Sequence, residues 1–233
     1  MSATNWQTVP AELEVCRWEF PPSTKWPASD LVGRGADLSP ATMIHSYSRG
    51  IFPMPAEPDD RDSEIAWWSP LSRAVLPLDG LAATKSMRRS ANRYNVRVDT
   101  SFEQVMQGCA APHRPGAWIT QQFVDAYVDL HELGWAHSIE TFDENDQLVG
   151  GLYGVRIGNF FAGESMYHLS RDASKVALMT LVEMMNVSKM KLLDVQWQTP
   201  HLQSLGAVEI DRAEYLIRLA AALTPPLHSP RNL

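Results

Sequence analysis

Asp194 and Gln196 are the residues whose types and spacing point most directly to chemistry. They stand two apart in a strand predicted over residues 191–198, so their side chains are expected to share one face. An acid among apolar neighbours needs a partner, which Gln196 or a backbone N–H group would supply. The pair is therefore either a structural hydrogen-bonded pair or a device that holds an attacking amine. In the second case Gln196 orients the amine and is not a base, because an amide accepts protons poorly.

Glu164 is a second acid in an apolar setting, because it follows Phe160, Phe161 and Ala162. We expect its carboxyl group to be buried and paired. Two interpretations remain open, namely the floor of a pocket that receives a polar group and a salt-bridged acid of the core.

Four cations, Lys85, Arg88, Arg89 and Arg93, recur at spacings of three and four residues. A helix predicted over residues 81–91 would gather them on one basic face. The whole chain carries a formal net charge of -7. Against that background, the basic face is either merely solvated or a patch that binds phosphates.

The sequence lacks the motifs of several other kinds of active site. The histidines show no metal-ligand spacing, and Cys16 and Cys109 are too few for a cysteine zinc site. The sequence has no HExxH pair, nucleophile-elbow serine or P-loop, so we expect neither a metal nor a bound cofactor. Some aromatic residues could stack on bases or line a pocket, although core packing explains any single one more simply. These are Trp67, Trp68, Trp118 and Tyr127.

Composition sets the broad class. The 233 residues are 45% hydrophobic, which suffices for one large domain or two unequal ones. The negative charge argues against non-specific coating of nucleic acid. The chain has two cysteines, no signal-peptide pattern and no apolar run long enough for a membrane span. We therefore expect a monomeric protein of the reducing cytoplasm.

The elements that must position these residues follow from apolar periodicity and turn residues. A meander of three antiparallel strands is predicted over 135–142, 148–155 and 160–167, followed by a helix over 173–184 and the strand over 191–198. This order predicts an α+β fold with a mostly antiparallel sheet. The other predicted elements are helices over 40–49, 102–110, 121–132 and 213–223 and strands over 73–76 and 94–98.

Local signals complete this outline. Ser39 is expected to cap the first helix, ahead of Pro40 at its first position. Residues 51–54 indicate an apolar loop, residues 57–64 an exposed acidic loop, and the tail from residue 224 a frayed end.

The order of the core elements is similar to that of the acyl-CoA N-acyltransferase (GNAT-like) fold. An enzyme of that fold that uses coenzyme A needs a glycine-rich turn before its main helix, where backbone N–H groups bind the pyrophosphate. Here residues 167–173 form this turn and contain no glycine. We therefore expect an acyl donor other than coenzyme A.

A set of motifs, in order over roughly residues 20–220, indicates a family. The chain resembles leucyl/phenylalanyl-tRNA–protein transferases. The motifs are GADLSP at 35–40, YSRGIFP at 47–53, WWSP at 67–70, WIT at 118–120, HELG at 131–134, HSIE at 137–140, GGLYG at 150–154, GESM at 163–166, ASK at 173–175, DVQ at 194–196 and HLQSLGA at 201–207. Any one motif is weak, and together they leave little room for chance.

The resemblance implies an enzyme that moves Leu or Phe from an aminoacyl-tRNA to the N-terminal Arg or Lys of a protein. This modification marks the protein for the bacterial N-degron route. The resemblance also implies a small N-terminal domain, residues 1–71, and an acyltransferase domain, residues 72–233.

Individual residues acquire roles from the same resemblance. Asp194 and Gln196 match the pair proposed to handle the attacking amine, and Glu164 matches a pocket acid near the donor aminoacyl group. The basic face matches the tRNA-contacting cluster. The apolar donor pocket is matched by Leu152, Phe161, Gly163 and Met166, and the aromatic residues around the 3′ adenosine and the pocket by Tyr47, Trp118 and Tyr127.

The chain also departs from the family pattern. On the pocket helix, members often have aromatic residues where this chain has Leu181 and Met185. We expect this change to alter the shape of the pocket and the preference among Leu, Phe and Met as donor side chains.

Two alternatives remain open. One is a coenzyme A-dependent N-acyltransferase of the same fold, which the missing glycine turn disfavours. The other is a non-catalytic adaptor that binds tRNA or peptide, with a satisfied Asp194–Gln196 pair in a closed core and no adjacent pocket.

Overall fold

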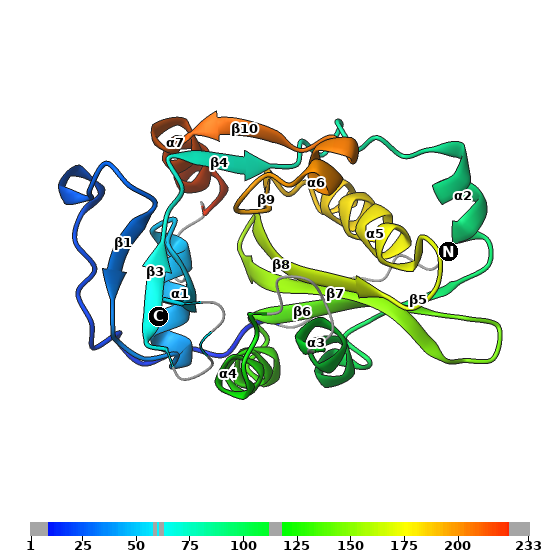
Figure 1. The fold of residues 1–233 in the computed structure, drawn as a ribbon, viewed down its shortest axis with the longest axis horizontal. Coiled ribbons are helices and arrows are strands. Elements are labelled where there is room, and N and C mark those ends of the chain that lie inside the picture. The colour runs from blue at the N-terminus through cyan, green and yellow to red at the C-terminus, as the bar shows by residue number, and fades with distance from the viewer. Residues whose placement is uncertain (1–8, 58–59, 61–62, 112–117, 224–233) are drawn as a thin grey trace, which may run out of the picture.

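The computed structural model describes residues 9–57, 60, 63–111 and 118–223. Their strands form two sheets, one of three strands and one of seven, with helices packed against both (Figure 1). A short 3-10 turn, η1, covers Ser23–Lys25. The helices are α1 (Pro40–Ser48), α2 (Lys85–Ala91), α3 (Phe102–Ala110), α4 (Gln121–Glu132), α5 (Ala173–Val187), α6 (Pro200–Ser204) and α7 (Arg212–Ala222).

The larger sheet contains the predicted meander. Its strands are β4 (Ser72–Val75), β5 (Asn95–Val98), β6 (Ala136–Phe142), β7 (Leu148–Ile157), β8 (Phe160–His168), β9 (Leu192–Asp194) and β10 (Val208–Asp211). They lie in the order β10-β4-β9-β8-β7-β6-β5. Neighbouring strands are antiparallel, except that β8 and β9 run parallel. A mixed but mostly antiparallel sheet agrees with the expectation from the sequence.

Helices cover both faces of this sheet. Helix α5 lies on one face, and α3 and α4 lie on the other (Figure 1). Two adjacent glycines of β7 show which helix covers which face, because successive side chains of a strand point to opposite faces. A Cβ atom at Gly150 would meet Ala173 of α5, whereas one at Gly151 would meet Val105 of α3.

The smaller sheet packs with α1 and consists of β1 (Leu31–Arg34), β3 (Ile65–Trp68) and β2 (Phe52–Pro55), in that order. The expectation of a loop over residues 51–54 is wrong, because β2 pairs with β3 from Phe52 to Pro55. Prolines 53 and 55 weaken the strand signal in the sequence. An edge strand such as β2 tolerates them, since one side of it needs no hydrogen bonds.

Helix α1 begins as expected, with Ser39 at the N-cap position and the following proline at the first position, but the hydrogen bonds of this cap and the start of α2 differ from expectation. The Ser39 side chain makes no capping hydrogen bond to α1. Instead, Asp37 accepts hydrogen bonds from the Ser39 N–H group at 3.0 Å and from the Thr42 hydroxyl at 2.7 Å. Helix α2 begins at Lys85 and not at residue 81, because the Thr84 side chain accepts from the N–H group of the third helical residue at 3.2 Å and fixes the start there.

Some sequence expectations fall outside the described residues. These are the tail 224–233 and residues 58–59 and 61–62 of the acidic loop. In the described part of that loop, Glu64 forms an ion pair with Arg34 at 3.1 Å. Within the described ranges, none of the helices combines the length and the apolar character that crossing a bilayer requires.

Candidate active site

Arg73 and Asp194 form a buried ion pair between β4 and β9. Arg73 Nε donates to Asp194 Oδ1 at 2.8 Å, and Arg73 Nη2 donates to Oδ2 at 2.5 Å. The two side chains are 1% and 0% exposed. The backbone N–H group of Gln196 also donates to Oδ1 at 2.9 Å, and the Tyr215 hydroxyl donates to Oδ2 at 2.8 Å. Both oxygens of Asp194 are thus occupied, and protein shields the acid from any substrate.

Arg73 joins the two sheets. Its guanidinium carbon lies 4.6 Å from the centre of the Phe52 ring on β2 and 4.4 Å from that of Tyr215 on α7. Burial alone would lower the pKa of Arg73, but the Asp194 carboxylate raises it above its ordinary value. Arg73 was not predicted as a site residue, because it lies 121 residues from Asp194 in the sequence. The available signal was a single cation at the start of an apolar strand, which implies a buried partner.

Gln196 does not lie on β9. The strand ends at Asp194, and Gln196 has a φ of 58°, in the left-handed region. The prediction of a strand over residues 191–198, with Asp194 and Gln196 on one face, is therefore wrong. The chain turns to follow β4, where Val195 N–H donates to the Ala74 carbonyl and the Gln196 carbonyl accepts from Ala74 N–H. The Asp194 carboxylate stabilises this bend through the backbone of Gln196.

The Gln196 side chain connects this bend to Glu164. Gln196 Nε2 donates to Glu164 Oε1 at 2.9 Å, and the Tyr127 hydroxyl donates to Oε2 at 2.9 Å. The hydroxyl oxygens of Tyr127 and Tyr47 lie 2.6 Å apart. Both tyrosines are buried, whereas Glu164 is partly exposed. Side chains from α1, α4, β8 and the bend after β9 thus meet in one network.

Glu164 is the additional residue of a β-bulge in β8. Tyr153 of β7 faces Ser165, and Gly154 faces Gly163, which leaves Glu164 without a partner on β7. Gly154 is required opposite the bulge, because a Cβ atom there would lie 2.1 Å from a backbone carbonyl oxygen. Bulges commonly redirect side chains beside active sites, and here the bulge directs the acid toward α4.

The bulge also decides which side chains face α5. Phe161 and Met166 are five residues apart, so in a regular strand they would point to opposite faces. The additional residue brings both to the α5 face, in one apolar cluster with Leu152, Leu181 and Met185. This cluster brings together the residues that the resemblance assigns to the donor pocket, with Gly163 on the same face.

The network lies where two central strands separate. Strands β8 and β9 pair from Phe160–Leu192 to Ala162–Asp194, where β9 ends. The next four residues of β8, residues 163–166, are partly exposed, whereas the preceding three are buried. The separation of the strands therefore gives Glu164 its access to solvent.

Burial governs the titration of the network. Loss of hydration raises the pKa of Glu164 to about 7, against the opposing effect of hydrogen bonds from Tyr47 and Tyr127. Burial, together with the charge of Glu164, raises the pKa of both tyrosines well above its ordinary value. Near neutral pH, Glu164 can therefore gain or lose a proton while the tyrosines remain hydrogen-bond donors.

The basic residues lie apart from this network. Lys85, Arg88, Arg89 and Arg93 are all exposed, on α2 and just after it. Trp118 is partly buried and packs edge-on against an aromatic ring in the first turn of α4. The structure thus gathers the acids, the amide and the tyrosines at one point and leaves the basic face as a separate surface.

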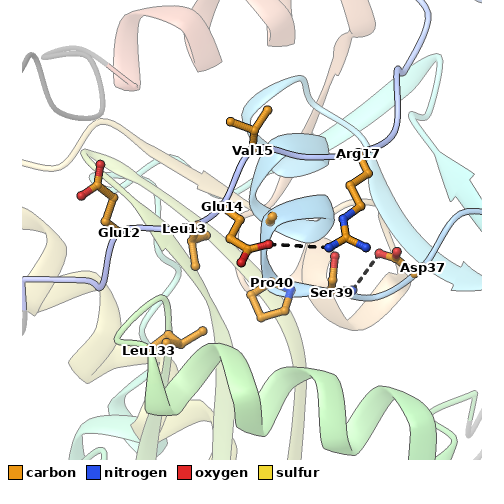
Figure 2. A pocket seen from close by; sticks show the side chains of 10 residues that line it. Glu12, Leu13, Glu14, Val15, Arg17, Asp37, Ser39, Pro40 and Leu133 are labelled. Atoms are coloured by element: carbon orange, nitrogen blue, oxygen red, sulfur yellow. Dashed lines mark hydrogen bonds and ion pairs between the residues drawn. The ribbon is translucent and has the colours of Figure 1, made fainter.

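A cavity of about 400 Å³ lies elsewhere, between the N-terminal segment and the start of α1 (Figure 2). Its lining includes Leu13, Val15 and Asp37. Hydrogen bonds, one of them from Trp18 at 2.9 Å, lower the pKa of Asp37 to about 2 although burial opposes this. No residue of the Glu164 network lines this cavity, so it is not the candidate active site.

The chemistry available to the network is the handling of an amine. Gln196 Oε1 makes no hydrogen bond with the part of the chain that the structure describes. An amide oxygen beside a carboxylate that titrates near neutral pH can accept the hydrogens of an amine. The apolar cluster on the α5 face of β8 is closely packed, with Phe161, Leu181 and Met185 at most 1% exposed. Fold and site together fit the class of enzymes that transfer an acyl group to an amine.

Comparison with known proteins defines the family within that class. The family model described as "Leucyl/phenylalanyl-tRNA protein transferase" matches residues 75–220, and the model of the corresponding N-terminal domain matches residues 36–71. The chain therefore belongs to the leucyl/phenylalanyl-tRNA–protein transferase family, and the resemblance seen in the sequence is confirmed.

Individual relatives have the same name, and this chain matches most of their length. The protein named leucyl/phenylalanyl-tRNA–protein transferase in Pseudoalteromonas atlantica is 43% identical over 87% of this chain and 88% of its own. The protein of that name in Herpetosiphon aurantiacus is 46% identical over 80% of this chain and 95% of its own. Among solved structures, that of L-PGS from Bacillus licheniformis covers 65% of this chain and 64% of its own, with a TM-score of 0.39 and 11% identity, too distant to assign the fold.

Proposed function

We propose that this chain transfers Leu or Phe, and also Met, from aminoacyl-tRNA to the N-terminal Arg or Lys of acceptor proteins, and so marks them for N-degron degradation. Family membership supports the aminoacyl transfer. The observation that carries the proposal is the connected network of Glu164, Gln196 and Asp194 beside an apolar cluster.

The apolar cluster receives the donor side chain. Phe161 and Met166 supply it from β8, and Leu181 and Met185 supply it from α5. Aliphatic and thioether side chains on α5 adapt their shape more readily than aromatic rings do. The pocket therefore accommodates Leu and Met as well as the flat ring of Phe.

The reaction is the aminolysis of an ester. The α-amino nitrogen of the acceptor forms a bond to the carbonyl carbon of the aminoacyl ester, and the bond from this carbon to the ribose oxygen breaks. One proton passes from the nitrogen to the leaving oxygen. An α-amino group has a pKa of about 7.7–8.0, so neutral amine is available near pH 7. Positioning can then contribute up to roughly 7–11 kcal/mol in ideal cases.

Glu164 and Gln196 act on the amine. Gln196 Oε1 accepts one of its hydrogens while Gln196 Nε2 holds Glu164 in place. The Glu164 carboxylate accepts a hydrogen bond from the neutral amine, takes the proton that the nitrogen loses as the new bond forms, and passes it to the leaving ribose oxygen. Tyr127, itself fixed by Tyr47, holds the other carboxylate oxygen.

Asp194 acts as a positioning residue. Its oxygens are fully occupied and its side chain is 0% exposed. It therefore orients the amine through Gln196, whose bend it stabilises. In this proposal Glu164, and not the enclosed Asp194, stabilises the positive charge that develops on the amine.

A two-part organisation, with a boundary near residue 71 and a GNAT-like second domain, belongs to the same proposal. The two family models meet between residues 71 and 75. The parallel β8 and β9, joined through α5 and separated beyond Ala162, support the acyltransferase-type core.

The start of α5 argues against coenzyme A as the donor. Asp172 immediately precedes the helix, and its carboxylate is 8% exposed. It accepts hydrogen bonds from Ser86, Ser90 and Lys175 at 3.1–3.2 Å. An anionic side chain thus lies at the helix end where coenzyme A would place its pyrophosphate.

The test is transfer of a labelled amino acid. The protein is incubated with labelled Leu-tRNA and a peptide that begins with Arg, and in parallel with labelled acetyl-CoA and the same peptide. We expect label on the peptide from Leu-tRNA alone, and none on a matched peptide with an acetylated N-terminus. Acetylation of the peptide would support the coenzyme A alternative, and tRNA binding without transfer would support the adaptor.

A further inference from the structure

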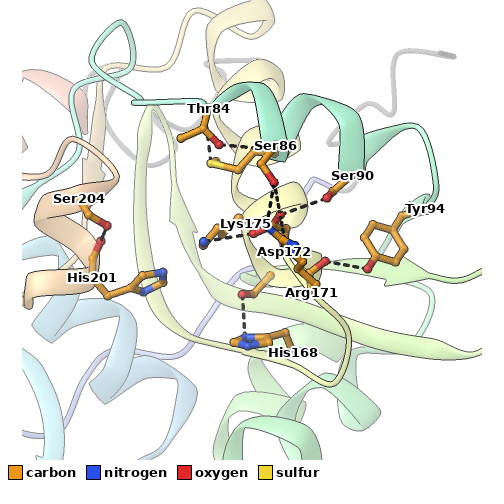
Figure 3. Close-up of polar contacts among 12 residues, drawn as sticks. Thr84, Ser86, Ser90, Tyr94, His168, Arg171, Asp172, Lys175, His201 and Ser204 are labelled. Atoms are coloured by element: carbon orange, nitrogen blue, oxygen red, sulfur yellow. Dashed lines mark hydrogen bonds and ion pairs between the residues drawn. The ribbon is translucent and has the colours of Figure 1, made fainter.

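Three basic side chains from three elements gather at the start of α5. His168 ends β8, Lys175 lies in the first turn of α5, and His201 lies on α6. Figure 3 shows the His201 ring turned toward Lys175 and His168. Partial burial, followed by the influence of Lys175 and His168, lowers the pKa of His201. The three side chains thus lie around one point at the start of α5 (Figure 3).

The hydrogen-bonding capacity of these side chains is largely unused. The His201 ring makes no hydrogen bond within the described ranges, and the contact of His168 Nδ1 with Ser174 Oγ is long, at 3.3 Å. Lys175 Nζ lies 3.2 Å from Asp172, but Asp172 is already held by two hydroxyl groups of α2. Ring N–H groups without a strong partner, beside a lysine, are donors that an anionic ligand can use.

This group, the His168–Lys175–His201 cluster, lies between α2 and the network. Asp172 binds α2 to the start of α5 (Figure 3), so the exposed cations of α2 adjoin the cluster on one side. On the other side, His168 follows Glu164 by four residues of β8, or about 13 Å at the usual rise of a strand. A nucleic-acid strand that runs from α2 to Glu164 would pass over the cluster on the α5 face and then reach the acid at the edge of β8 beyond the end of β9.

We propose that the His168–Lys175–His201 cluster binds a backbone phosphate of the single-stranded 3′ end of the aminoacyl-tRNA. The inference rests on the proposed function and adds a contact that neither the basic face nor the network supplies. Lys175 offers a point charge, and each histidine offers a ring N–H donor. Phosphate contacts position a nucleic acid without reading its sequence. The cluster therefore holds the 3′ end in place whichever amino acid it carries.

The test compares two donors that differ in their phosphates. Phe-tRNA carries the whole 3′ strand, whereas the phenylalanyl ester of adenosine carries no phosphate. In His168→Ala/His201→Ala and in Lys175→Gln, the Kd of Phe-tRNA should rise roughly three- to tenfold, with a salt slope lower by about one unit for each lost contact. The KM of the adenosine ester should not change in either variant.

Matched variants separate a lost contact from a damaged fold. Lys175→Arg keeps the charge and should keep the affinity for Phe-tRNA. Arg218→Gln removes an exposed cation on α7, paired there with Glu214, and should leave both donors unaffected. Thermal unfolding curves of all variants establish that they are folded.

Three outcomes would overturn the proposal. One is an unchanged Kd and salt slope for Phe-tRNA, and another is an equal loss with both donors. The third is displacement of Phe-tRNA by acetyl-CoA, whose phosphates share this chemistry and which would then be the ligand of the cluster. Failure of the proposed function is distinguishable, because the wild-type protein would then transfer from neither donor while tRNA binding still depended on the cluster.

Discussion

Asp194 and Glu164 are two acids of one network with opposite environments. Asp194 is fully buried and receives four hydrogen bonds, two of them from Arg73. Glu164 is partly exposed and receives its hydrogen bonds from neutral groups, Gln196 and Tyr127. Different environments give two carboxylates different roles. Here Asp194 fixes the geometry, and Glu164 remains available for proton transfer.

Gln196→Ala removes the amide that links the two acids. We expect kcat to fall roughly 100-fold, because loss of precise positioning has an effect of that size, while the Kd of Phe-tRNA changes little. Single-turnover transfer and tRNA binding measure the two effects. Gln198→Ala is the matched control, because Gln198 donates to the Ala207 carbonyl and lies outside the network. Equal effects of the two substitutions would contradict the assigned role.

Glu164→Gln should change how stability depends on pH. The folded-state pKa of Glu164 is raised from 4.5 to about 7, so the folded protein holds this proton more tightly than the unfolded chain does. As pH rises from about 4.5 to 7, the unfolded chain loses the proton first, and the free energy of unfolding falls. The glutamine variant does not ionise and avoids this loss.

The variant should therefore gain stability relative to the wild type, by on the order of 1–3 kcal/mol, between about pH 4.5 and pH 7 and hold that gain above it. Urea denaturation at both ends of this range measures the gain. Other groups, such as the buried Glu140, titrate in both proteins and cancel in the difference. A difference in stability that stays constant with pH would contradict the raised pKa. Aminoacyl transfer should be lost in the same variant.

At the scale of elements, the two glycines at the bulge in β8 differ in what requires them. The backbone requires Gly154, and we expect the donor side chain to require Gly163. A Cβ atom at Gly163 would meet nothing closer than the Asp194 carbonyl oxygen at 3.5 Å, whereas one at Gly154 would lie 2.1 Å from the Ala162 carbonyl oxygen. We expect Gly163→Ala to change the free energy of unfolding by less than about 1 kcal/mol, and Gly154→Ala to destabilise the fold by several kcal/mol.

Function should respond in the opposite way at Gly163. Its new methyl group would point to the α5 face, toward the apolar cluster, and narrow the pocket. We expect kcat/KM to fall more for Phe-tRNA than for Leu-tRNA, because the flat ring adapts less to a narrower space. Transfer assays with the two donors measure this ratio. A ratio equal to that of the wild type would place Gly163 outside the donor pocket.

Local signals made most elements predictable. The predicted helices over 102–110 and 121–132 coincide with α3 and α4, because apolar periodicity is contained in the segment itself. The errors at β2 and at the end of β9 have a different cause. In both places a distant strand decides the outcome, β3 for the prolines of β2 and β4 for the bend at Gln196. No local pattern records such a partner.

At the scale of the whole molecule, Arg73 connects the sheets and balances Asp194. Arg73→Met should cost roughly 3–5 kcal/mol of the free energy of unfolding, because it leaves a buried carboxylate without a counter-charge. The double variant Arg73→Met/Asp194→Leu removes both charges and should recover most of this stability while remaining inactive. Urea denaturation followed by tryptophan fluorescence measures both changes. A double variant less stable than Arg73→Met would contradict this account.

The residues of the site were predictable to different degrees for the same reason. Glu164, Asp194 and Gln196 are polar residues in apolar runs, and this contrast marks them in the sequence. Arg73 shows a weaker contrast, and its pairing with Asp194 emerges only when β4 lies beside β9. The fold class could thus be predicted from local order, whereas the pairing inside the site required the assembled sheet.

Glu164, the residue of β8 without a partner on β7, has a consequence for how such a protein could lose its activity during evolution. Every other residue of β8 from Phe160 to His168 has a partner on β7. An in-frame deletion of the codon for Glu164 would therefore leave the register intact on both sides and close the hairpin into a regular one. Such a gene would still encode a folded protein with the basic face of α2, but one without the Glu164 carboxylate. In a genome, such a protein would be recognised because its strand β8 is one residue shorter. No substituted residue would indicate that the activity had been lost.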